Sequence, residues 1–376
     1  MSASSLPTRW TWSFLVLVAI GVGWTVATNL GRLPTGARGY YNRGVVDSRE
    51  GKLESAIRNL DRALELEPDR TDAYIARAMT WIRSDRPYAA ITDADAALRL
   101  APTAVRAHYV RGLAWLRAGR ENEALASFQQ ANEADPSFGR ATIAIGNVAF
   151  DRGHWSRALD AYRKACGLRH DDDAMHYAPM LVWAARSLSG DRAGAEIELR
   201  DLIRGRTLDR FRLASWLDAA TQPEPAASES EEQDAVLAWI AGVRALARGN
   251  RRQALTSFRA AVARAPADSW VRERARAMLE STTVGLRVAL ENREISSSFS
   301  FGPGIEVTCV RDGGPASRSG VAAGDRLVRI DGADASSGGV DAIVTGGEIG
   351  REVTLELLRG SKPVSAVLVV GGDAAR

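Results

Sequence analysis

The sequence predicts an array of paired helices, a separate β-rich domain at the C-terminal end and one membrane-spanning helix at the N-terminal end. The helical array is indicated by prolines at 68, 102 and 136, which are evenly spaced 34 residues apart, a period typical of stacked helix pairs. The β-rich domain is indicated by a change of composition near residue 283, after which Gly, Val and Ser dominate and apolar residues alternate. The membrane helix is indicated by the absence of any charged side chain between Arg9 and Arg32.

The length and the charge of the chain limit what it can be. It has 376 residues, enough for two or three folded units. Lys and Arg number 49 against 46 Asp and Glu, and the two signs are interspersed along the chain. A protein that binds nucleic acid concentrates its basic residues on one face, so no nucleic-acid partner is expected. The two cysteines, Cys166 and Cys309, lie in different predicted domains, which excludes a disulfide framework.

Residues 1–9 form a short tail, and residues 10–31 are predicted to cross a lipid bilayer as a signal anchor. As a helix that rises 1.5 Å per residue, this run spans about 30 Å, the thickness of a bilayer core. Trp10 and Trp12 lie at one end and Trp24 near the other, as expected of aromatic rings at the two headgroup levels. A cleaved signal peptide is the alternative, because residues 25–27 form a small-x-small cleavage site.

Residues 37–280 form the predicted helical array, whose first units start at residues 37, 71, 105 and 139. In each unit the eighth residue is Gly or Ala, the twentieth is Ala, and the twenty-fourth fills the remaining space between the two helices. These residues are Gly44, Ala56 and Leu60; Ala78, Ala90 and Ala94; Gly112, Ala124 and Phe128; and Gly146, Ala158 and Tyr162. Small residues let two helices approach closely, and proline ends the second helix. This ladder closely resembles the tetratricopeptide repeat (TPR), which implies an α-solenoid.

The phase of the repeats weakens after Asp173. Residues 180–188 and 193–202 still have the pattern of a helix pair, and residues 219–234 form an acidic stretch with few apolar residues, predicted to be a flexible loop. One further unit in good phase contains Gly242, Ala254 and Phe258. The helix predicted from residue 270 to residue 279 is expected to cap the open end of the solenoid.

The resemblance implies that the fifth and ninth residues of each unit line a concave groove. These residues are Tyr41, Val45, Ile75, Met79, Tyr109, Leu113, Ile143 and Asn147. An apolar groove of this kind suits an extended or helical segment of a partner protein. The alternative is that these side chains only pack against one another inside the superhelix. Some TPR proteins hold a C-terminal carboxylate with Asn and Lys residues, and Val45 replaces the first of these, so that activity is not expected here.

The thirteenth residue is arginine in the first three units: Arg49, Arg83 and Arg117. Such a row resembles a track for anions. Each arginine, however, lies in the last turn of its helix, where a cation complements the negative end of the helix dipole. We therefore expect these arginines to stabilise helix ends.

Residues 283–372 are predicted to form a second domain of five strands and two short helices. The strands are predicted at 284–288, 304–310, 325–330, 351–358 and 364–370, and the helices near 315–319 and 340–345. The segment 313–332 carries a Gly-Pro-Ala helix start, an Ala-Gly-Asp turn and an Ile-Asp-Gly hairpin turn. It closely resembles the core of a PDZ domain of the bacterial envelope-protease type, which implies a partly open β-barrel with two short helices.

In such PDZ domains, the C-terminus of a partner adds as a strand beside the second strand and faces the second helix. The resemblance implies that the loop of Val284, Gly285 and Leu286 holds the carboxylate of that peptide. The groove walls that it implies are Ile305, Val307, Val340, Ile343 and Val344. The long Ser-rich stretch 291–303 favours an alternative, in which this stretch covers the groove and the domain binds no peptide.

The sequence contains no residue set typical of catalysis. The four histidines lie inside the helical repeats, and neither a Gly-x-Ser-x-Gly motif nor a phosphate-binding glycine loop occurs. His170 and the three aspartates that follow it are typical of a helix stop and the start of the next helix, so no metal site is predicted. We therefore expect neither an enzyme nor a cofactor.

These features together predict a non-catalytic protein-protein interaction scaffold or adaptor. Its expected partners are subunits of a membrane or envelope complex, peptide C-termini, and the lipid bilayer through residues 10–31. The alternative function is a regulatory subunit that captures C-terminal peptides for a separate envelope protease.

Two features of the sequence bear on the side of the membrane on which the folded domains lie. Arg32, Arg38 and Arg43 follow the predicted span, and the positive-inside rule would keep the folded domains in the cytoplasm. Large domains, however, cross a membrane largely regardless of their charge. The resemblance to envelope PDZ domains leads us to expect a single-pass protein of a bacterial inner membrane with its folded domains in the periplasm.

Overall fold

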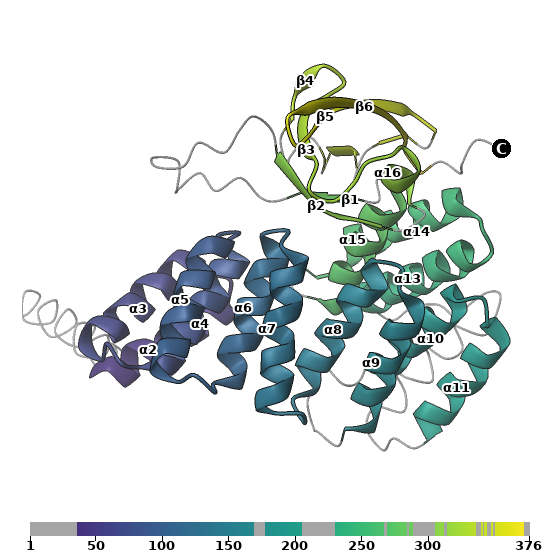
Figure 1. Cartoon of the computed structure of the whole chain (residues 1–376). Helices are drawn as coiled ribbons and strands as arrows, with labels where there is room; N and C mark the ends of the chain where they lie inside the picture. The colour runs from purple at the N-terminus through teal and green to yellow at the C-terminus, as the bar shows by residue number, and fades with distance from the viewer. Residues whose placement is uncertain are drawn as a thin grey trace, which may run out of the picture.

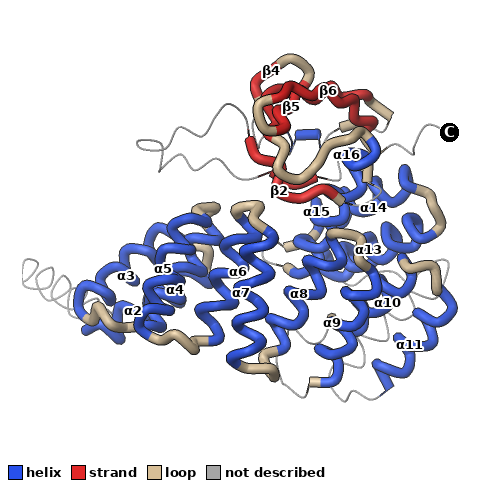
Figure 2. Tube along the Cα trace, viewed as in Figure 1, coloured by secondary structure: helices blue, strands red, loops and turns tan. Residues whose placement is uncertain are grey.

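The computed structural model describes residues 36–168, 177–204, 230–266, 269–283, 286–288, 305–311, 314–335, 340, 342–343, 347–348 and 350–371. Its helices form an array of stacked pairs, and a small β-rich domain lies over the end of that array formed by the last helices (Figures 1 and 2). Within the described ranges, no helix combines the length and apolar character that a membrane span requires. The predicted membrane helix, residues 10–31, lies outside those ranges.

The first four units are the helix pairs predicted from the proline spacing. They are α2 (Gly36–Arg49) with α3 (Leu53–Leu66), α4 (Thr71–Arg83) with α5 (Pro87–Leu100), α6 (Val105–Arg117) with α7 (Glu121–Ala134), and α8 (Gly139–Asp151) with α9 (Trp155–Gly167). The first helices of successive units stand in one row, because α4 contacts both α2 and α6. The first helices carry the eight residues predicted to line the groove, and their row is called the inner face below.

The two helices of a unit touch where the sequence predicts close contact. A Cβ atom at Gly112 would lie 2.4 Å from a ring carbon of Phe128, and one at Gly146 would lie 2.6 Å from the ring of Tyr162. Real Cβ atoms do not approach other atoms so closely, so each aromatic ring uses space that only glycine leaves open. The predicted ladder of small and aromatic residues is confirmed.

The turn inside each unit requires a left-handed backbone conformation. Gly51, Gly119 and Gly153 have φ angles of 78°, 76° and 80°, and Asp85 takes the same place in the second unit with φ 60°. A residue with a side chain costs roughly 1 kcal/mol more than glycine in this conformation. The turn of the second unit is therefore strained.

Replacing Asp85 with glycine is expected to raise the free energy of unfolding by about 0.5–1 kcal/mol, because it removes this strain. Asp85 also accepts a hydrogen bond from Nε of Arg117 at 3.0 Å, but both side chains are exposed, so its loss costs little. Urea denaturation of the full-length protein measures the change. Gly51→Asp is the matched control and should lower the free energy of unfolding by a similar amount. A less stable Asp85→Gly protein would contradict the argument.

The second half of the array keeps the predicted pairs. α10 (Ala178–Leu188) pairs with α11 (Arg192–Arg204), and α13 (Glu231–Ala247) pairs with α14 (Arg251–Arg264). The prediction of a loop over 219–234 is wrong at its end, because residues 231–234 form the first turn of α13. Ser230 accepts a hydrogen bond from the N–H of Gln233 at 3.2 Å and caps the helix, and acidic side chains suit the positive end of a helix. Residues 219–229 lie outside the described ranges.

The β-rich domain is built on one antiparallel sheet. Its elements are β1 (Leu286–Val288), β2 (Ile305–Val310), α16 (Pro315–Arg318), β3 (Arg326–Ile330), β4 (Ala333–Asp334), β5 (Glu352–Arg359) and β6 (Lys362–Val369). The strand order is β1-β2-β3-β5-β6, with β4 on β3. The pairings of the described strands leave β1 and β6 at opposite ends, so these strands form an open sheet and not a closed barrel. The two-residue strand β4 was too short to be predicted from alternation.

The domain also corrects the expected place of strand addition. β2 pairs with β3 through Ile305 and Glu306, and with β1 through Val307, Cys309 and Val310. Because β2 has partners on both sides, a peptide cannot add beside it as predicted. Among the described strands, β1 is the outer strand at this end of the sheet, so a peptide would have to add to β1.

Candidate functional site: two candidate interaction surfaces

The first candidate surface is the inner face of the helical array. Of its eight predicted groove residues, six are partly buried and two are buried; these are Tyr41, Val45, Met79, Tyr109, Leu113 and Asn147, and Ile75 and Ile143. All eight lie on the row formed by α2, α4, α6 and α8. Some of these residues therefore suit internal packing and others suit partner binding. Ile143 is only 2% exposed and belongs to the core, whereas the first three units keep partly exposed apolar side chains.

The fourth unit is covered by the chain's own last helix. Helix α15 (Trp270–Thr283) packs against α13 and α14 and also against α8. Arg274 of α15 forms an ion pair with Asp151 at the end of α8, and its guanidinium lies 5.3 Å from the ring centre of Phe150. The helix predicted to cap the solenoid therefore also closes the inner face at the fourth unit.

This ion pair is buried. The side chain of Arg274 is 3% exposed and that of Asp151 is 11% exposed. Burial by itself lowers the pKa of an arginine, but Asp151, with smaller contributions from Tyr162 and Glu273, outweighs this effect and holds the pKa of Arg274 above its usual value. Sequence reasoning missed the pair, although one signal was present: Asp151 is the thirteenth residue of the fourth unit, where the first three units have arginine.

Asn147, the one polar residue of the predicted groove, is used inside the array. Its Oδ1 accepts a hydrogen bond from the hydroxyl of Tyr162 at 2.9 Å. Burial raises the pKa of that hydroxyl well above its ordinary value, so Tyr162 stays a neutral donor. Beside it, the rings of Tyr177 and Trp270 stack with their centres 4.7 Å apart. The inner side of the fourth unit is thus occupied by the chain itself, and the predicted groove is limited to the first three units.

The second candidate surface is the peptide edge of the β-rich domain. Val284, Gly285 and Val344 lie outside the described residues. Leu286 lies in β1, in register with Val310 of β2. The other predicted wall residues are all buried; these are Ile305, Val307, Val340 and Ile343. The structure thus places the described wall residues in the interior of the domain.

Several contacts between described residues join the β-rich domain to the array, among them three made by arginines. Nη1 of Arg120, in the turn between α6 and α7, lies 2.9 Å from Oε2 of Glu306 in β2. The guanidinium of Arg311, directly after β2, lies 5.1 Å from the ring centre of Trp155. Arg259 of α14 donates a hydrogen bond to the carbonyl oxygen of Gly347 at 2.6 Å. The buried apolar side chains of α13, α14, α15 and the sheet form one continuous core.

Arg311 is unusually placed for a cation. Burial lowers the pKa of Arg311 to about 10. The positive charge of Arg251 lowers this pKa further, whereas the negative charge of Asp151 raises it. Asp151 therefore pairs with a buried arginine of the last helix and acts electrostatically on a partly buried arginine of the β-rich domain. This carboxylate is the electrostatic centre of the junction between the two parts.

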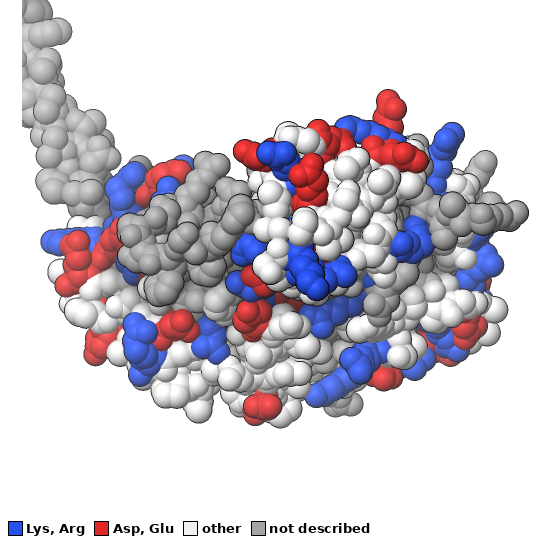
Figure 3. Space-filling view, turned by 45° about the horizontal axis from the view of Figure 1, so that its top comes forward, with Lys and Arg blue, Asp and Glu red and all other residues white. Residues whose placement is uncertain are grey.

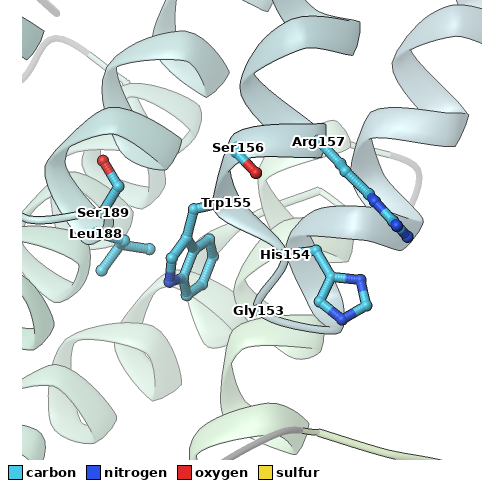
Figure 4. Close-up of a pocket in the computed structure, with 7 residues that line it drawn as sticks. All are labelled: Gly153, His154, Trp155, Ser156, Arg157, Leu188 and Ser189. Carbon is cyan, nitrogen blue, oxygen red and sulfur yellow. The ribbon is translucent and has the colours of Figure 1, made fainter.

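A shallow pocket of about 500 Å³ lies beside this junction, between the start of α9 and the end of α10. Its lining residues are Gly153, His154, Trp155, Ser156, Arg157, Leu188 and Ser189 (Figure 4). His154 and Arg157 lie on the side of Trp155 away from Leu188, and no carboxylate lines the pocket, so the set does not form an acid-base pair or a nucleophile with its base. Among the described residues no cluster of metal-ligating side chains occurs, and the His170–Asp173 segment lies outside them.

The distribution of charge on the surface is the next feature of the two candidate interaction surfaces. Basic and acidic side chains are interspersed over the face shown in Figure 3, as the sequence predicts. A groove built from helix pairs and an open sheet edge both recognise segments of other proteins. The fold and the two surfaces thus define a protein-protein interaction adaptor.

The comparisons with known proteins agree with this class. Family models for the tetratricopeptide repeat match residues 37–70, 82–137 and 122–174, and the model for the PDZ domain matches residues 282–370. The chain is therefore a tetratricopeptide-repeat protein with a C-terminal PDZ domain. Both matching families are interaction domains, and neither is an enzyme family.

Several solved structures are similar to the helical array. The pilF protein of Pseudomonas aeruginosa has 17% identity and a TM-score of 0.42, with 64% of this chain and 97% of that one covered. A tetratricopeptide repeat protein from Parabacteroides merdae has 18% identity and a TM-score of 0.41, with 65% and 84% covered. MamA from Desulfovibrio magneticus RS-1 has 21% identity and a TM-score of 0.38, with 46% and 97% covered. A comparison with curated proteins gave no match.

Proposed function

We propose that this protein is a non-catalytic scaffold anchored in a bacterial inner membrane by residues 10–31, with its folded domains in the periplasm. In this role the TPR groove and the PDZ edge hold segments of different subunits of an envelope complex. The anchor rests on the uncharged run between Arg9 and Arg32, and the compartment rests on the resemblance of segment 313–332 to envelope PDZ domains.

The observation that carries this proposal is the continuous core between the last repeats and the PDZ domain. Domains joined by a flexible linker search for partners independently, whereas domains that share a core hold their binding surfaces at a fixed distance. A fixed arrangement supports a scaffold better than a carrier that hands unfolded chains to a protease.

Gentle detergent extraction of the tagged full-length protein, followed by mass spectrometry, tests the proposal. Gly285→Glu places a charge in the predicted carboxylate loop, and Ser365→Glu places the same charge on exposed β6 as a control. We expect membrane partners in a fixed ratio with the parent and with Ser365→Glu. Loss of partners with Gly285→Glu assigns them to the PDZ edge, and their survival assigns them to the groove. A transient protease as the sole partner would favour the regulatory subunit, and no specific partner at all would overturn the scaffold.

The orientation needs its own measurement. Protease treatment of intact cells with a permeabilised outer membrane should degrade the folded domains if they lie in the periplasm. Protection of these domains until the inner membrane is broken would place them in the cytoplasm and contradict this part of the proposal.

A further inference from the structure

Helix α15 shows how a helix sits on the inner face of this array. It has 14 residues, and it meets the fourth unit through Arg274, which pairs with Asp151 and lies over Phe150. Phe150 and Asp151 are the twelfth and thirteenth residues of their unit. Helix α15 thus places a charge opposite the thirteenth residue of the unit that it contacts, and this charge lies over the ring of the twelfth residue.

The same position has the opposite charge in the first three units. Arg49 and Arg117 are exposed there, and Arg83 is partly buried and donates a hydrogen bond to the carbonyl oxygen of Ser48. Arg117 pairs with Asp85, but the two side chains are 47% and 64% exposed. A pair this exposed is worth less than about 1 kcal/mol, so Asp85 does not prevent Arg117 from binding another anion.

The thirteenth residues form one border of the predicted groove, and the second residues of the units form the other. This second border is also mainly basic. The second residues of the four units are Arg38, Asp72, Arg106 and Arg140, all of them exposed. Between the two borders lie the partly buried side chains of the first three units, which are Tyr41, Val45, Met79, Tyr109 and Leu113. Glu50, next to Arg49 in the sequence, lies 2.7 Å from Lys52, and this pair is as exposed as that of Arg117 and Asp85, so it is equally weak.

We propose that the groove of the first three units binds an acidic amphipathic helix of a partner protein. This inference rests on the proposed function and names the class of partner that the groove takes. The apolar side of the helix covers the aromatic and aliphatic floor, and its Asp and Glu residues face Arg49 and Arg117, as Arg274 faces Asp151 with the charges reversed. A basic helix similar to α15 is rejected there by like charges.

Three synthetic peptides of the same length as α15 test this inference with the full-length protein. They share one pattern of leucines at helical spacing, and the remaining positions are mainly Glu in the first, Lys in the second and Gln in the third. Fluorescence anisotropy of labelled peptides measures their affinities. We expect the Glu peptide to bind about tenfold or more tightly than the Lys peptide, and we expect its affinity to fall as salt is added.

Charge reversal then locates the site. Arg49→Glu together with Arg117→Glu should weaken the Glu peptide by about tenfold and strengthen the Lys peptide, because two exposed ion pairs become two repulsions. Arg99→Glu, an exposed arginine of the outer helix α5, is the matched control and should change neither affinity more than about twofold.

The outcomes separate this inference from the proposed function. Equal binding of all three peptides, lost on Met79→Asp, would overturn the acidic partner and keep a groove that binds proteins. Binding of the Glu peptide that survives the double reversal would overturn the site. Binding of no peptide would also overturn the inference, while the fixed-ratio partners of the extraction experiment would still support the scaffold.

Discussion

Replacing Asp151 with alanine is expected to lower the free energy of unfolding by about 3–5 kcal/mol, the largest loss of any single substitution considered for this protein. The substitution leaves Arg274, which is only 3% exposed, without its counter-charge. It also removes the carboxylate that offsets the burial of Arg311. Both the last helix of the array and the docked PDZ domain should be affected, because Asp151 acts on one arginine from each.

The free energy is best followed by urea denaturation together with hydrogen exchange at two places. Exchange in α15 reports on the last helix of the array, and exchange in β2 reports on the PDZ domain. Asp151→Ala with Arg274→Met removes both partners of the pair, and this double variant should recover a large part of the lost stability, because apolar groups replace a buried ion pair at little cost. Arg163→Ala is the control, since its pair with Glu198 is partly exposed. A loss with Asp151→Ala no larger than the control loss would refute the role of the pair.

Replacing Gly112 with valine is expected to lower the free energy of unfolding by about 2–3 kcal/mol. The new Cβ would lie 2.4 Å from a ring carbon of Phe128, a side chain with no exposed surface, so the third unit must open to accept it. Valine also loses side-chain freedom in a helix. Denaturant unfolding and the far-ultraviolet circular dichroism of the folded state measure the effect.

A second substitution should restore part of the stability that Gly112→Val removes, and the second unit shows why. The second unit has Ala78 and Ala94 at these two positions, so a larger eighth residue is tolerated where the twenty-fourth is small. The double variant Gly112→Val with Phe128→Ala should therefore be less damaged than the sum of its two single changes. Gly167→Val, at a helix end with open space around it, is the control. Additive losses would show that the close contact is not the cause.

Much of the helical array could be predicted from local patterns. The spacing of Pro68, Pro102 and Pro136 placed the four helix pairs, because a repeat fold uses the same contacts in every unit. The acidic stretch before Trp239 misled the prediction by a few residues, because low apolar content is shared by flexible loops and by the first turn of a capped helix. Ser230 as a helix cap decides between the two.

The candidate sites were predicted less completely. The eight groove positions follow from the repeat, but their division into an open part and a covered part depends on α15, which meets α8 across 123 residues of sequence. The chain has 49 Lys and Arg residues, and no local pattern says that Arg274 is the one that pairs with Asp151. The peptide edge was placed on β2 rather than β1, because strand order is not visible in the alternation of a single strand.

The sequence by itself determined the elements of this protein: the paired helices, the small residues at their contacts, the strands of the PDZ domain and its turns. These features repeat at short intervals and depend on neighbouring residues, so they can be recognised locally. Only the tertiary structure decided that α15 closes the fourth unit, that β1 is the outer strand, and that the PDZ domain shares a core with the last repeats. Those decisions depend on contacts between residues far apart in the chain, where burial and charge pairing select one arrangement among many that the local patterns allow.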